Sequence, residues 1–156
     1  MRLEKYWHVI PDKEMLQGLE LEQAQAIFRL LMVASFADSE VTDEERLTLA
    51  QAVTRLPFFR PGEWHMFEQM RGIQVLGNLF ERWKAEPVAI LTEIRDKLPE
   101  EPERVLALRL AALFMQSDGY AEDEHAFCMT VGEAFGLDSE VINVVLQDVV
   151  DWAEAP

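Results

Sequence analysis

The sequence predicts an all-α protein, a compact bundle of about seven helices, and three observations carry this prediction. Apolar residues recur at spacings of three and four along most of the chain, which is the period of a helix rather than a strand. Proline and glycine interrupt these segments where helices would begin or end. Apolar residues make up 49% of the 156 residues, so one domain of this length can bury a substantial core.

The expected helices follow in chain order from these signals. A short helix begins near Asp12, and a longer one covers about residues 22–37 with apolar residues on most of its surface, so that protein should surround it. The clearest start is Thr42, an N-cap that forms a capping box with Glu45, in a helix that ends near Pro57. Further helices are expected after Pro61 and at about residues 87–98, 104–116, 122–135 and 139–152.

Local signals define several of these boundaries. Pro87 is expected as the first residue of its helix, where its missing N–H is not needed. The stretch PEEPE at residues 99–103 is interpreted as an acidic link between two helices. Gly136 and a capping Asp138 should separate the last two helices.

The two halves of the chain are related by a shift of 80 positions. This shift places Arg29-Leu30 on Arg109-Leu110, Asp38 on Asp118, and Asp43-Glu44 on Asp123-Glu124. The matches fall in one helix–acidic loop–helix unit, so we expect an internal pseudo-two-fold repeat with halves at about residues 22–56 and 102–136. Since a solenoid usually needs three or more units, residues 1–156 are predicted to form a single globular domain.

The charge of the chain limits its partners. A formal net charge of -15, from 29 acidic and 14 basic residues, argues against binding to nucleic acid and to anionic lipid. It suits a protein that attracts cations or docks onto a basic protein. The start of the chain lacks the apolar core of a secretion signal, and the apolar runs are too short to span a membrane. We therefore expect a soluble cytoplasmic protein without direct membrane insertion.

Three further groups of residues are candidates for either packing or function. Cys128 is the single cysteine, so it can form neither an internal disulfide nor a cysteine zinc site, and it is expected to pack as a small apolar group. His125 is expected at an exposed helix position. The aromatic cluster within residues 58–67 is assigned to core packing, with a groove for a partner as the alternative.

Two acidic loops carry the candidate site. The first is FADSEVTDEE at residues 36–45 and the second is QSDGYAEDEH at residues 116–125. One interpretation is structural, because acidic residues in a first helical turn are stabilised by the helix dipole. The other is a shared cation site formed by Asp38, Glu44, Asp118 and Glu124, whose oxygen ligands suit calcium or magnesium. Neither loop is an EF-hand, because both lack the required glycine and the final glutamate.

The same loops resemble a known family. The segments ADSEVTDEE and SDGYAEDEH are similar to the paired ADGE-(I/V)-x-x-x-E motifs of the TerB-like domain of tellurite-resistance proteins. The resemblance covers about residues 22–136 and implies an all-helical, pseudo-two-fold bundle with an acidic metal-binding surface. The motif residues correspond to Asp38, Glu44, Asp118 and Glu124. Ser39 and Tyr120 depart from the family pattern, in which a glycine and an acidic residue stand at these positions.

The leading functional prediction is a non-enzymatic TerB-like interaction module in a bacterial stress response, such as the response to tellurite, that binds a divalent cation and an unidentified protein partner. The first alternative is a scaffold or co-chaperone-like domain that docks a basic protein without metal. The second is a metal-assisted hydrolase, although no motif for positioning a substrate accompanies the carboxylates. The sequence leaves the oligomeric state open.

Overall fold

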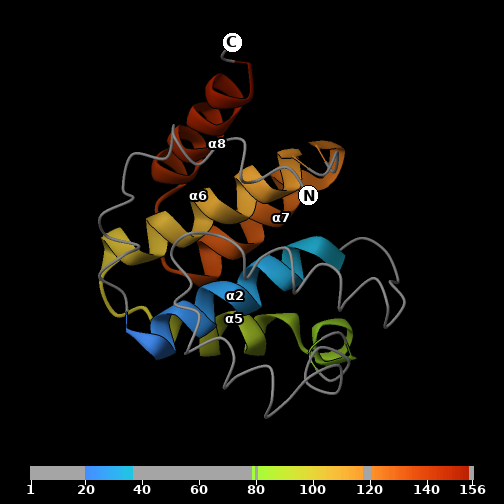
Figure 1. The fold of residues 1–156 in the computed structure, drawn as a ribbon, viewed down its shortest axis with the longest axis vertical. Coiled ribbons are helices and arrows are strands. Elements are labelled where there is room, and N and C mark those ends of the chain that lie inside the picture. The colour runs from blue at the N-terminus through green and yellow to red at the C-terminus, as the bar shows by residue number, and fades with distance from the viewer. Residues whose placement is uncertain (1–19, 37–78, 80, 118–120, 155–156) are drawn as a thin grey trace.

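The computed structural model describes residues 20–36, 79, 81–117 and 121–154, and all regular structure within these ranges is helical. A short helical segment at residues 81–85 precedes α5. The prediction of an all-α bundle is therefore confirmed. The expected helix near Asp12 and the capping box of Thr42 and Glu45 lie outside the described residues. The helices with defined bounds are α2 (Leu21–Phe36), α5 (Pro87–Asp96), α6 (Glu101–Ser117), α7 (Ala121–Ala134) and α8 (Ser139–Glu154) (Figure 1).

Helix α6 lies at the centre of the described helices, where it contacts α2, α7 and α8 (Figure 1). Residues 106–108 and 110–113 of α6 are each at most 1% exposed. In α2, residues 26–28 and 30–34 are each at most 3% exposed, which confirms the prediction that protein surrounds this helix. Helix α5 completes the core by packing on α2 and α7. No helix in these ranges is both long enough and apolar enough to cross a bilayer.

Helix α7 contributes apolar and aromatic side chains to the same core. Cys128 is fully buried, as expected for a small apolar group. The neighbouring Phe127 is 6% exposed, and its ring centroid lies 5.9 Å from that of Trp83 in a tilted arrangement that suits two aromatic quadrupoles. His125 is exposed, as predicted. The buried face of α7 therefore serves packing.

The start of α6 differs from the sequence prediction. The helix begins at Glu101, inside the stretch PEEPE that was interpreted as a link, and before the expected start at Arg104. Pro102 is tolerated in the first turn because the N–H groups there have no helical acceptor. Glu101 and Glu103 lie in the same turn, where the helix dipole favours negative charge. By contrast, Pro87 is the first residue of α5, as predicted.

The turn between α7 and α8 has the hydrogen bonds of a Schellman motif. Gly136 adopts a φ of +74°, in the left-handed region that glycine enters without steric cost. Its N–H donates to the carbonyl of Glu133 at 3.0 Å, and the N–H of Leu137 donates to the carbonyl of Gly132 at 2.9 Å. Helix α8 then begins directly after Asp138. The predicted division between the last two helices is therefore correct, and its cause is the backbone freedom of Gly136.

Two arginines bind the carbonyls at the end of α7. Arg104 Nη1 donates to the carbonyl of Phe135 at 3.1 Å, while its Nε donates to the carbonyl of Leu98 at 2.6 Å. Arg95 Nη1 donates to the carbonyl of Ala134 at 3.4 Å. A cation at a helix C-terminus satisfies carbonyls that lack a helical donor and interacts favourably with the dipole. Arg104 thereby joins the segment after α5 and the end of α7 to α6.

An ion pair with two hydrogen bonds links residues 81–85 to α5. Arg82 Nη2 lies 2.6 Å from Glu93 Oε1, and Arg82 Nη1 lies 3.1 Å from Glu93 Oε2. The hydrogen bonds from Arg82 lower the pKa of Glu93, and the positive charge of Arg82 acts in the same direction. The two side chains are 43% and 48% exposed, so water screens the pair and limits its contribution to about 1 kcal/mol or less.

We expect the pair to contribute stability at neutral pH and to lose that contribution in acid. Because the folded pKa of Glu93 is lowered, its stabilisation is complete above the ordinary glutamate pKa and disappears as pH falls through the lowered folded pKa. The variant E93Q should therefore be less stable than the wild type at about pH 7, by about 1 kcal/mol or less, and equal to it at about pH 2. Urea denaturation at both pH values measures this difference.

The variant R82Q supplies the control for this prediction. Its Glu93 carboxyl should titrate with a higher pKa than in the wild type, which an NMR titration of the side-chain carbon detects. An identical Glu93 pKa in R82Q and wild type would contradict the assignment to Arg82.

Candidate functional site

The four predicted cation ligands fall almost entirely outside the described part of the chain. Asp38 and Glu44 follow α2, and Asp118 follows α6, in segments that lie outside the described residues. Glu124 belongs to the first turn of α7. Within the described ranges, no group of three or more His, Cys, Asp or Glu side chains could hold a metal ion. The shared site of these four residues therefore stays a prediction.

The helices that precede the two acidic loops lie side by side. Figure 1 shows α2 and α6 running in the same direction, from the left of the view to the right, and the two helices contact each other. Gln23 Nε2, near the start of α2, donates to Glu103 Oε1, near the start of α6, at 2.9 Å. These residues are 80 positions apart, which equals the shift predicted to relate the two halves of the sequence.

This contact joins equivalent positions of two parallel helices. A rotation about an axis between the helices would bring equivalent residues face to face in this way. Both helices then end on the same side of the bundle, α2 at Phe36 and α6 at Ser117 (Figure 1). The acidic segments that follow these helices in the sequence begin outside the described residues.

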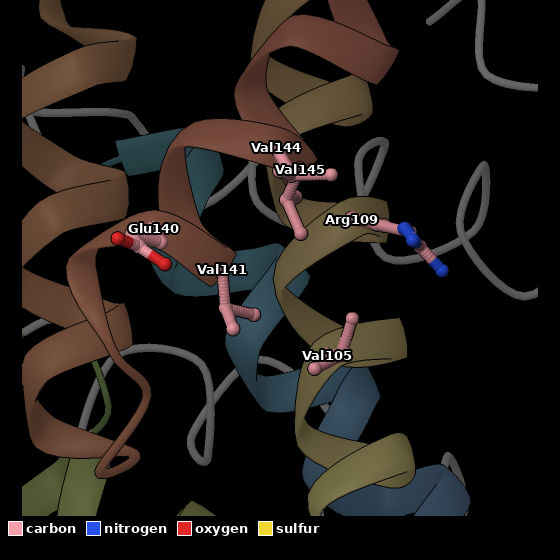
Figure 2. Close-up of a pocket in the computed structure, with 6 residues that line it drawn as sticks. All are labelled: Val105, Arg109, Glu140, Val141, Val144 and Val145. Atoms are coloured by element: carbon pink, nitrogen blue, oxygen red, sulfur yellow. The ribbon is translucent and has the colours of Figure 1, made fainter.

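A second candidate surface is a groove between α6 and α8. It has a volume of about 280 Å³ and is lined by Val105, Arg109, Glu140, Val141, Val144 and Val145 (Figure 2). The valines form its apolar wall, with Val145 fully buried and Val144 56% exposed. Arg109 lies on the α6 side, and its Nη2 is 3.5 Å from Asp148 Oδ2 of α8.

Two acidic residues follow the valines on the same face of α8, beyond the groove. Val141, Val144, Asp148 and Asp151 are separated by three, four and three residues, so they form one stripe on the helix. The first half of this stripe is apolar and the second half carries two carboxylates. Helix α8 contains no lysine or arginine. Arg109 and Glu140 are the charged residues that line the groove itself, and Asp148 and Asp151 lie beyond it on the same face of α8. We call the groove valines Val105, Val141 and Val144, taken together with Asp148 and Asp151, the valine–aspartate groove.

The valine–aspartate groove is not among the sites predicted from the sequence. The signal was present, because Val141 and Val144 lie on a different side of α8 from the buried Ile142 and Val149. A helix with apolar residues outside its buried stripe indicates a second contact surface. The wall of the groove that α6 forms could not be predicted from the sequence, because the packing of α6 against α8 is a tertiary contact.

Comparisons with known proteins add no family assignment: no family model, curated protein or solved structure matches this chain.

Proposed function

We propose that this protein is a non-enzymatic, TerB-like interaction module that binds one divalent cation, calcium or magnesium, between its two acidic loops. The ligands are Asp38, Glu44, Asp118 and Glu124. The setting is a cytoplasmic stress response of bacteria, such as the response to tellurite, which follows from the resemblance of the two loop motifs to that family.

The observation that carries this proposal is the arrangement of α2 and α6. Their shared direction and the bond between Gln23 and Glu103 support a pseudo-two-fold relation in which the two acidic loops begin on one side of the bundle. Carboxylates that converge without a cation repel one another. A hard divalent cation with oxygen ligands removes that repulsion.

The cation acts as an electrostatic link in this proposal. It binds one acidic loop from each half, so its binding fixes the orientation of the halves and the shape of the surface offered to a partner. The excess of 15 negative charges draws cations toward the protein in general, and the two loops supply two pairs of carboxylates from equivalent positions.

Isothermal titration calorimetry with calcium and magnesium tests the proposal. We expect wild-type protein to bind one ion per chain, and D38A/D118A to bind it about 10-fold or more weakly because two charged ligands are lost. The control variant E81A/D96A removes the same number of charges from exposed positions elsewhere and should bind as the wild type does. Absence of binding to the wild type, or equal losses in both variants, would refute the cation site.

A further inference from the structure

We infer that the valine–aspartate groove between α6 and α8 docks an amphipathic, positively charged helix of a partner protein. This inference rests on the proposed role as an interaction module, but it requires no cation and uses none of the four proposed ligands. It commits to one class of partner, and the shape and charge of the groove carry the argument.

The apolar half of the groove provides the contact area. Val105 of α6 and Val141 of α8 are partly buried, and Val144 exposes 56% of its surface. In Figure 2 these valines lie on two adjacent helices with the groove between them. A groove between two packed helices is the shape that receives the apolar face of a third helix. Covering Val144 would remove the largest apolar exposure on the described part of α8 from water.

The acidic half of the groove supplies charge complementarity. Asp148 Oδ2 contacts Arg109 at 3.5 Å, and Asp151 Oδ1 accepts a hydrogen bond from Gln147 at 3.0 Å. Asp148 is 36% exposed in its side chain and Asp151 is also exposed, so both carboxylates remain accessible to a further cation. Helix α8 carries no lysine or arginine, so among the residues that line the groove a basic side chain of the partner meets a like charge only at Arg109 of α6, which Asp148 pairs.

The other classes of occupant fit this surface less well. A second copy of the chain would bring another net charge of -15 to an acidic face, and nucleic acid or anionic lipid would be repelled in the same way. A basic helix satisfies both the valines and the aspartates.

The stripe on α8 also fixes what the partner helix must carry. Val141 and Val144 lie one turn apart, and Asp148 and Asp151 continue the stripe for two further turns. The partner therefore needs apolar side chains at i and i+3 or i+4, followed one or two turns away by lysine or arginine. A helix with the same apolar face but acidic flanks should be rejected.

Fluorescence anisotropy with two synthetic probes tests the inference. The first probe is a fluorescein-labelled helix with leucine on one face and lysine on the other, and the second has the same leucines with glutamate in place of lysine. We expect the protein to bind the lysine probe. Its affinity for the glutamate probe should be at least about 10-fold lower. Equal binding of both probes would overturn the role of the aspartates.

A matched pair of variants separates groove binding from general attraction to an acidic protein. V144K places a charge in the groove, whereas V88K places the same charge on α5, where Val88 is 62% exposed. Affinity for the lysine probe should fall about 10-fold in V144K and change by less than about 2-fold in V88K. Equal losses in the two variants would mean that only long-range attraction operates, and the inference would fail.

Three further readouts exclude the other occupants and the cation. Probe binding should be the same in calcium, in chelator and in D38A/D118A, so loss of cation binding leaves this result unchanged. If sedimentation shows that V144K dissociates an oligomer that V88K leaves intact, the occupant is a second copy. If V144K lowers the melting temperature of the free protein more than V88K, the chain itself already covers the groove. Either result would overturn the docking of a partner helix.

Discussion

Replacing Phe135 with alanine is expected to lower the free energy of unfolding by about 3–5 kcal/mol, the cost typical of removing a buried phenylalanine ring. Phe135 is fully buried and follows the last residue of α7. Because a domain is usually stable by only about 5–15 kcal/mol, this one change should remove much of the total. The melting temperature should fall by about 2–4 °C for each kcal/mol lost.

Urea denaturation of F135A and F135L measures this effect and its origin. The hydrogen bond from Arg104 to residue 135 uses the main-chain carbonyl, so both variants retain the acceptor and the loss reports side-chain packing. F135L keeps most of the buried apolar volume and should lose much less stability than F135A. A loss in F135A below about 1 kcal/mol would show that this part of the core is not closely packed.

The second large effect is expected at the contact between α7 and α8. A Cβ atom added at Gly132 would overlap the Cγ1 and Cδ1 atoms of Ile142, which is fully buried and has little room to move. G132A should therefore lower the free energy of unfolding by about 1–3 kcal/mol through overpacking, even though alanine favours a helix by about 1 kcal/mol over glycine.

A double-mutant cycle with I142V identifies the cause. Valine lacks the Cδ1 atom, so G132A/I142V should be more stable than the sum of the single effects by about 1 kcal/mol. Gly136 provides the control, because a Cβ added there meets no atom within 4 Å and strains only the backbone at a φ of +74°. G136A and I142V should therefore be additive. Additive energies for G132A and I142V would contradict a direct steric contact.

Much of the fold could be predicted because its signals are local. Pro87 begins α5 and Gly136 ends α7 since each residue restricts or frees the backbone by its own chemistry. The start of α6 was misplaced because acidic residues and Pro102 are typical both of loops and of first helical turns, and only the continued backbone hydrogen bonding distinguishes the two.

The candidate sites depend on contacts that no local pattern encodes. The sequence indicates that Gln23 and Glu103 occupy equivalent positions, but their hydrogen bond requires α2 and α6 to pack in parallel. Likewise, the exposure of Val144 could be predicted from α8 alone, whereas the opposite wall formed by Val105 could not. The joint cation site of Asp38 and Asp118 depends on the same kind of long-range relation.

The bond between Gln23 and Glu103 illustrates what the predicted repeat within one chain would permit that a homodimer does not. In a symmetric homodimer, a residue that meets its own counterpart beside the two-fold axis is restricted to contacts with an identical side chain. Two glutamates there would repel each other, and two glutamines would lack the ionised acceptor. Since the two halves of a single polypeptide can change independently, one side here donates as an amide and the other accepts as a carboxylate.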